Sequence, residues 1–252
     1  MERKIKKAVK LKMSMEKEVQ VLALLSALLL ILVFSLVSAT PTGPDSINVT
    51  SNTTKSAAAG YKINISGGYI AKLNITATAQ NPHWKAFAGW VTGKFTLDDS
   101  TGSTIYDWTL SSVSGEVYAT RTSSTPSWSS VRCANSTEIE NENTALAHSS
   151  PDDNITATFA GVNSNTFVVA GTQITAGSCN ATNTYVNNAS QNSVFEESIL
   201  SDTSNIIFVT NIESGGATGY DGNSYDFQML VPENGSSTWT GAIAYYLYVE
   251  LG

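Results

Sequence analysis

The sequence predicts an all-β protein, an antiparallel β-sandwich that could take the jelly-roll form, behind one N-terminal hydrophobic helix. Beyond residue 60, apolar and polar residues alternate with a period of two in short segments, as they do in half-buried strands. Clusters of Gly, Asn, Ser and Asp separate these segments and are typical of turns. A nearly charge-free apolar run over residues 19–37 precedes them and is long enough to cross a hydrocarbon layer as a helix.

The N-terminal segment predicts export of the rest of the chain. Residues 1–18 hold seven of the 14 Lys and Arg residues but only three of the 21 acidic ones. The positive-inside rule therefore keeps this basic segment in the cytoplasm and places everything after Ala39 outside. Two interpretations of residues 19–39 stay open: a signal peptide cleaved after Ala39, or an uncleaved transmembrane anchor. Both predict an extracellular or cell-surface location.

A third interpretation of this segment is a type IV prepilin leader, cut ahead of the apolar helix. Glu18 would then be the acidic residue near the new N-terminus. The similarity is poor, because Met13-Ser14-Met15 stands where such leaders have Gly or Ala at the cut.

The charge of the exported part excludes one class of partner. From Thr40 onward, seven basic residues face 18 acidic ones, a net charge of −11. Such a body repels phosphate backbones, so we expect no nucleic-acid binding. The expected partners are the membrane, through an uncleaved helix, further copies of the chain or other envelope proteins, and glycans.

The elements expected along the exported chain are mostly strands. Residues 40–60 are rich in Ser and Thr and predict a stalk with one short strand, and residues 61–252 predict the β-sandwich domain of about ten strands. Val194–Ser201 is the one later segment that suits a short helix. The expected strands cover residues 46–50, 69–78, 87–97, 104–110, 154–159, 205–210, 225–231 and 241–251, with a hairpin turn at 98–103.

The two cysteines predict a disulfide. Cys133 and Cys179 are the only cysteines, and both lie in the exported part, where the environment is oxidising. A metal pair is the alternative, but no histidine lies near either residue in the sequence. We therefore expect one bridge that closes a loop of about 46 residues.

Asn-x-Ser/Thr motifs predict a surface glycoprotein. Some lie on the polar phase of an alternating segment, which lets a glycan point into water. The unmodified alternative is that such motifs simply follow from an Asn- and Thr-rich surface. The candidate residues are Asn48, Asn52, Asn64, Asn74, Asn135, Asn154, Asn180, Asn188 and Asn234.

Candidate catalytic residues occur but form no recognisable constellation. Adjacent carboxylates lie at Asp98-Asp99, Asp152-Asp153 and Glu196-Glu197, whereas a glycosidase needs two carboxyls that face each other across a cleft. His83 and His148 lie in loop-like sequence, and no Gly-x-Ser-x-Gly motif accompanies them. We expect no enzyme and no cofactor.

Two ligand sites are weaker alternatives. Asp221, Asn223 and Asp226 resemble a truncated calcium loop that lacks the Gly at position six and the closing Glu, so a plain turn is the simpler explanation. Aromatic residues could instead line a sugar-binding platform, although such residues more often fill a core. The tryptophans that could do so are Trp84, Trp90, Trp108, Trp128 and Trp239.

Aromatic and glycine positions give the chain a further resemblance. The runs Gly68-Tyr-Ile-Ala-Lys-Leu-Asn-Ile, Tyr106-Asp-Trp108 and Tyr225-Asp-Phe-Gln-Met-Leu-Val resemble archaeal secreted or surface β-sandwich proteins. This resemblance implies a surface setting and no catalytic activity. We therefore expect a structural cell-surface glycoprotein, either an envelope component or a filament subunit. A carbohydrate-binding or adhesive module is the second hypothesis, and an extracellular hydrolase is the third.

Overall fold

A computed structural model describes residues 39–252, which belong to one of two separate units, Ser38–Gly252. The expectations for residues 1–38 lie outside the described residues, including the basic segment, the apolar helix and most of the cleavage motif. Within residues 39–252, no helix is both long and apolar enough to span a membrane.

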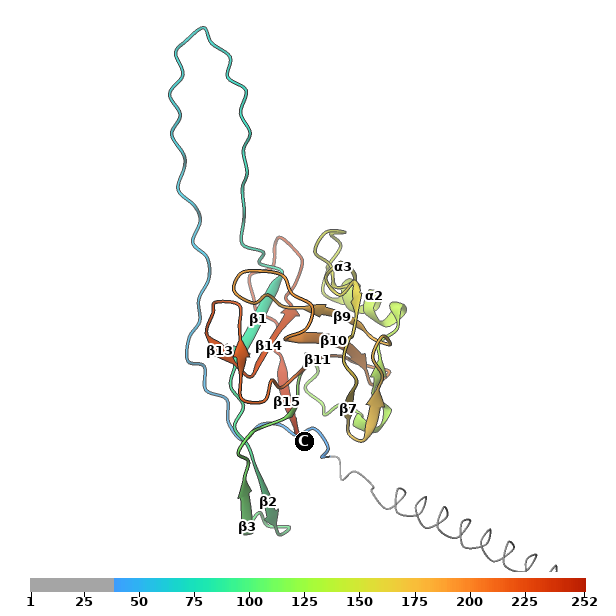
Figure 1. The fold of residues 1–252 in the computed structure, drawn as a ribbon. Coiled ribbons are helices and arrows are strands. Elements are labelled where there is room, and N and C mark those ends of the chain that lie inside the picture. Colours follow the sequence, from blue (N-terminus) through green and yellow to red (C-terminus); the bar gives the residue numbers. More distant parts are fainter. Residues whose placement is uncertain (1–38) are drawn as a thin grey trace, which may run out of the picture. The chain divides into compact units, whose positions relative to one another are not determined.

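The main element is a seven-stranded antiparallel sheet (Figure 1). Its strands follow the order β15-β4-β11-β10-β9-β6, and β5 also pairs with β10. Its most apolar strands carry runs such as Ile206–Val209, because a strand covered on both faces needs apolar residues in both phases. The strands are β4 (Gly115–Thr120), β5 (Arg132–Cys133), β6 (Gly161–Val162), β9 (Asn180–Asn183), β10 (Glu196–Ser201), β11 (Ile206–Asn211) and β15 (Tyr246–Leu251).

Two separate hydrophobic cores cover the two faces of this sheet. The first contains Phe208 and Ile199 and lies beneath β1 (Trp84–Gly89), β14 (Phe227–Pro232), α2 (Ser136–Ala145) and α3 (Ile155–Thr158). The second contains Tyr118 and Leu200 and lies beneath η1 (Trp128–Ser130), β7 (Phe167–Val169) and β8 (Thr172–Ile174). Neighbouring residues such as Ile199 and Leu200 therefore point into different cores, as strand geometry requires.

Two short two-stranded ribbons lie outside the central sheet and its covers. β2 (Lys94–Asp98) and β3 (Thr104–Thr109) form a hairpin that pairs with no other strand. β12 (Ala217–Thr218) and β13 (Ser224–Tyr225) form a second two-stranded ribbon. With 32% strand, 8% helix and antiparallel sheets, the protein is mostly β, as the sequence predicts. The hairpin turn expected at residues 98–103 is confirmed.

The two helices contradict specific expectations. Residues 154–159 were expected to form a strand, but Ile155–Thr158 is helical because the Asn154 side chain accepts a hydrogen bond from the Ala157 amide at 2.7 Å. The expectation of a helix at Val194–Ser201 is also wrong, since that segment supplies β10. The longer helix α2 was not expected. Asn135 and Glu138 begin it with a capping box.

Several expected strands are shorter than predicted or absent. No strand forms at residues 46–50 or 69–78. The expected strand at 87–97 is two strands, β1 and β2, and the one at 241–251 begins only at Tyr246. In each case alternation marks an extended segment, but pairing depends on a neighbouring strand that the sequence pattern does not specify.

Residues 43–82 form an extended arm with almost every side chain exposed (Figure 1). Its first end follows Thr42, which exchanges two backbone hydrogen bonds with Val249 at 3.0 and 2.8 Å. The Lys55 ammonium donates to the Thr78 hydroxyl at 2.6 Å, so the two legs run side by side at this point. The second end enters β1 through His83.

The predicted disulfide is present. Cys133 and Cys179 are bonded across a sequence separation of 46 residues, with their Cα atoms 4.9 Å apart. The bridge joins β5 to the start of β9, and the buried Cys179 packs in the second core. It therefore connects the sheet to the loop that carries the β7–β8 cover.

We predict that replacing both cysteines by serine lowers the free energy of unfolding by about 3–4 kcal/mol, because the bridge restricts the unfolded chain. Urea denaturation followed by circular dichroism measures the loss. A reducing agent should destabilise the wild type by a similar amount and leave the double variant unchanged. An unchanged wild-type midpoint under reducing conditions would contradict the prediction.

Candidate functional site

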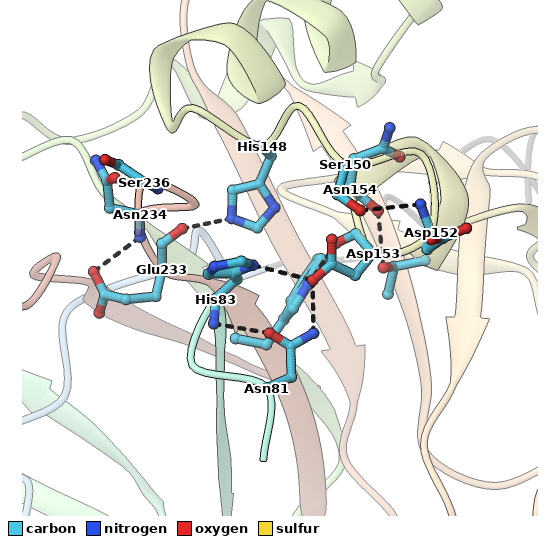
Figure 2. A network of polar contacts seen from close by, with 12 residues as sticks. Asn81, His83, His148, Ser150, Asp152, Asp153, Asn154, Glu233, Asn234 and Ser236 are labelled. Carbon is cyan, nitrogen blue, oxygen red and sulfur yellow. Dashed lines mark hydrogen bonds and ion pairs between the residues drawn. The ribbon is translucent and has the colours of Figure 1, made fainter. Parts of the chain in front are cut away.

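The only two histidines of the chain lie together (Figure 2). The ring centroids of His83 and His148 are 6.0 Å apart. Three segments meet here: the loop that leads from the arm into β1, the loop between α2 and α3, and the loop that follows β14. We call His83, His148, Asp153 and Glu233 the histidine cluster.

Asp153 is the central acceptor of this cluster. Its carboxylate lies 3.1 Å from His83 Nδ1 and accepts a hydrogen bond from the Asn81 side chain at 2.8 Å. Its backbone carbonyl accepts from Trp84 Nε1 at 2.7 Å. Burial alone would raise the pKa of Asp153, but the donors Asn81 and His83 hold it below its ordinary value.

His148 joins the loop after β14 to the same cluster. It is buried, and its Nε2 lies 2.5 Å from the Glu233 carbonyl oxygen, whereas its Nδ1 has no hydrogen-bond partner among the described residues. The Glu233 carboxylate forms an ion pair with Lys85 at 2.7 Å. Burial opposes ionisation of Glu233, but Lys85 keeps its pKa below the ordinary value.

Among the described residues, no serine hydroxyl is hydrogen-bonded to the ring of His83 or His148. The Ser150 hydroxyl accepts from the Asp152 amide at 3.3 Å, and the Ser236 hydroxyl bonds to Thr238 at 2.9 Å. Across residues 39–252, no three His, Cys, Asp or Glu side chains are placed to hold a metal ion. The contacts of the histidine cluster join the second end of the arm to two loops of the body.

Sequence reasoning missed this convergence. It assigned neither histidine a partner, and it treated Asp152 and Asp153 as one solvated pair. The structure separates them: Asp152 is exposed, whereas Asp153 is half-buried against His83. No local signal could reveal this, because the contact joins residues 70 positions apart.

The other acidic pairs also have different environments. Asp98 and Asp99 are exposed at the β2–β3 turn. Glu196 and Glu197 point to opposite faces of the sheet: Glu196 accepts from the amide and hydroxyl of Ser164, and Glu197 accepts from the Leu230 amide at 2.8 Å. Complete burial raises the pKa of Glu197 well above its ordinary value.

A facing carboxyl pair exists where the sequence pattern gave no sign of one. Glu116 on β4 and Glu250 on β15 are direct partners in the sheet register, and both are buried. Glu250 accepts from the Tyr118 hydroxyl at 2.8 Å and from the Ala170 amide at 3.0 Å. Burial, with the nearby Glu250 charge, raises the pKa of Glu116 to about 8. Both carboxyls are enclosed with the β7–β8 cover, so they do not offer a substrate cleft.

The proposed calcium loop forms a turn. Asp221 accepts from the Asn223 amide at 3.0 Å and from the Tyr225 hydroxyl at 3.0 Å. The backbone hydrogen bond from Asn223 makes the largest contribution to lowering the pKa of Asp221. Asp226 is engaged elsewhere and accepts from the Val91 amide at 2.8 Å. The three oxygen-bearing side chains therefore do not converge.

The tryptophans divide between the core and the surface. Trp128 is buried in the second core, and Trp84 is half-buried against the histidine cluster. Trp90, Trp108 and Trp239 are exposed. Trp90 lies beside Tyr225 with ring centroids 5.3 Å apart, and Tyr225 lies 6.0 Å from Tyr220.

The exposed large apolar side chains concentrate on two ribbons. Of the twenty such residues, nine lie on the arm and five on the β2–β3 hairpin. In the hairpin, Phe95 lies opposite Trp108 and Leu97 opposite Tyr106, so these four residues form one apolar face. Their exposed fractions are 40%, 50%, 57% and 60% respectively. This uncovered face and the arm are the candidate interaction surface.

The glycosylation motifs also concentrate on the arm. Asn48, Asn52, Asn64 and Asn74 are exposed there. Among the other five, Asn135 and Asn188 are exposed, whereas Asn154, Asn180 and Asn234 are half-buried. Modification of all nine stays a prediction, and the arm offers its four sites without a competing contact among the hydrogen bonds of the described residues.

Comparison with known proteins adds no relative, since no protein-family model, curated protein sequence or solved structure matches this chain.

We predict that the protein is more stable at pH 5 than at pH 8. Because the folded-state pKa of Glu116 is about 8, the unfolded state loses its proton first as pH rises, and the free energy of unfolding falls between about pH 4.5 and 8. Each pKa unit corresponds to about 1.4 kcal/mol, so the loss is on the order of a few kcal/mol.

Glu116→Gln should reduce this pH dependence, because the amide stays neutral throughout. Thermal unfolding at pH 5 and pH 8 measures the effect, and Glu140→Gln on the exposed face of α2 is the matched control. A wild type equally stable at both values would refute the assignment.

We predict that Asp153→Asn destabilises the protein by about 1–2 kcal/mol, because it weakens the charge-assisted contacts that join the α2–α3 loop to the loop entering β1. Asp152→Asn changes the neighbouring exposed carboxylate and should stay within about 0.5 kcal/mol of the wild type. Urea denaturation of both variants tests the distinction. Equal effects would mean that the histidine cluster does not hold these loops.

Proposed function

We propose that this chain is a non-catalytic structural protein of the cell surface, an envelope component or filament subunit that contacts other molecules through its arm and hairpin. One observation carries the proposal: fourteen of the twenty exposed large apolar side chains lie on these two ribbons. Soluble proteins rarely leave contiguous apolar surfaces uncovered unless those surfaces bind something.

The location outside the membrane is part of this proposal. Its support is the basic flank and the apolar run of residues 1–39, together with the arm's four exposed Asn-x-Ser/Thr motifs. The disulfide fits an oxidising environment. A two-sheet sandwich also belongs to the proposal, supported by the packing of β1 and β14 on the central sheet.

A carbohydrate-binding module is the second candidate, favoured by the exposed rings of Trp90 and Tyr220 on either side of the half-buried Tyr225. The planes of Tyr220 and Tyr225 differ by 13°, but Trp90 is tilted by 38° to Tyr225. The three rings therefore do not form one flat platform for a chain of sugars. The hydrolase hypothesis has less support, because the His–Asp pair has no positioned nucleophile among the described residues.

We predict that replacing Ile63, Ile65, Leu73 and Ile75 by Ser removes the protein from high-mass envelope complexes. Burying each such side chain contributes about 1.5–3 kcal/mol, so the bound fraction should fall by more than about tenfold. Mild detergent extraction of the producing cells, followed by native size separation, measures this fraction.

The control for this experiment replaces two exposed apolar residues elsewhere, Val162 and Tyr185, by Ser. It should leave the complexes intact. The structural proposal fails if the arm variant stays in the complexes, or if His83→Ala abolishes a hydrolytic activity while the protein remains folded.

A further inference from the structure

The β2–β3 hairpin has an apolar face that the described body does not cover. Phe95, Leu97, Tyr106 and Trp108 share this face, and the ring centroids of Tyr106 and Trp108 are 4.9 Å apart. The opposite face carries the ion pair of Lys94 with Asp107 at 2.7 Å, and Ile105, at the irregular register between Leu97 and Asp98, is also exposed. A two-stranded hairpin alone is marginally stable in water. A third strand or a covering layer would therefore stabilise this one.

The arm has the complementary pattern. In an extended chain, Ile63 and Ile65 project to one side while Lys62 and Asn64 project to the other. Leu73 and Ile75 repeat the pattern on the second leg. Each leg therefore has an apolar face and a polar face, as a strand on the border of a sheet has, but neither leg is paired as a strand in the single chain.

The charges of the two ribbons are opposite. The arm holds three lysines and one aspartate, a net charge of +2. The hairpin over residues 94–109 holds one lysine and three aspartates, a net charge of −2. The remainder of the chain from residue 83 is also strongly acidic. Opposite charge favours the encounter of an arm with a hairpin over that of two arms or two hairpins.

The second leg of the arm and the hairpin leave the body at opposite ends of one strand, whereas the first leg starts near the hairpin root, where the Asp45 charge acts on Lys94 (Figure 1). The arm's second leg enters β1 at its first residue, Trp84, and is held there by the histidine cluster. The hairpin follows the last residue of β1, and its root lies at Gly93, where a Cβ atom would come within 2.6 Å of a Leu251 methyl carbon. β1 has six residues and spans about 20 Å.

We propose that the arm of one copy of this chain covers the hairpin of a second copy by strand addition, so that copies join head to tail. This inference deepens the proposed structural function and rests on it. Strand addition provides backbone hydrogen bonds for affinity, and the apolar face provides specificity. Because arm and hairpin are different surfaces, the contact does not saturate in a dimer and extends into a chain of copies, either open or closed.

Complementation of two defective variants tests this contact. The arm-defective variant carries Ile63→Ser, Ile65→Ser, Leu73→Ser and Ile75→Ser, and the hairpin-defective variant carries Leu97→Ser and Trp108→Ser. Each full-length variant, purified in mild detergent, should be monomeric in analytical ultracentrifugation, whereas the wild type forms larger species as concentration rises. A mixture of the two should form a heterodimer and stop there, because only one intact arm–hairpin pair is available.

Three results would overturn the inference: a mixture that stays monomeric, either variant alone retaining the wild-type assembly, or a wild type that is monomeric at every concentration. The last result would mean that the arm covers the hairpin of its own chain or binds another molecule. Circular dichroism and the intact disulfide verify folding. Leu97→Ser alone replaces the double change if that variant does not fold. The control with Val162 and Tyr185 replaced by Ser should assemble like the wild type.

The two experiments distinguish failure of the arm–hairpin contact from failure of the proposed structural function. If the mixture stays monomeric while the arm variant is still lost from envelope complexes, the structural function stands and the arm binds a different envelope molecule. If the arm variant also stays in those complexes, both proposals fail.

Discussion

Burial of the central sheet on both faces is the constraint on which the rest of the fold depends. Strands β4, β10 and β11 carry large side chains in both phases, so each face needs its own cover. The elements around the sheet are therefore short, since each shields only part of one face. The same constraint buries carboxyl groups. Glu197 occupies a strand position that would suit an apolar residue, and its burial raises its pKa and favours the protonated acid.

The elements packed on the two faces of the central sheet form the body of the protein with it, whereas the arm and the hairpin lie outside this body. Most exposed strand edges are protected by charge, proline or a covering loop. The hairpin has charge on one face only, and the other is apolar and aromatic. The arm is secured at both ends, by Thr42 on β15 and by Asp153 beside His83, while the chain between them carries its apolar residues into solvent. An arm that is fixed at both ends and exposed between them is suited to contact with another molecule.

Local pattern predicted the β class, the β2–β3 turn and the disulfide, but it failed where one local signal has two meanings. Asn135 and Asn154 each begin an Asn-x-Ser/Thr motif, which suggested a glycosylated surface, and the structure shows that each also caps a helix. The same residue types favour both roles. The histidine cluster could not be predicted, because Asp153 and His83 are brought together only by the packing of separate loops.

The failed strand prediction over residues 69–78 has a different physical cause. Alternation of apolar and polar residues records a surface that is buried on one side. The segment has that pattern, yet Leu73 is 53% exposed and Ile75 is 84% exposed, so nothing in the single chain accounts for it. In an extended leg, Asn74 projects away from Leu73 and Ile75, so a glycan there would leave their face free. The leg has a pattern suited to a sheet but pairs with no strand of the described chain, and the proposed contact with a second copy would account for that pattern.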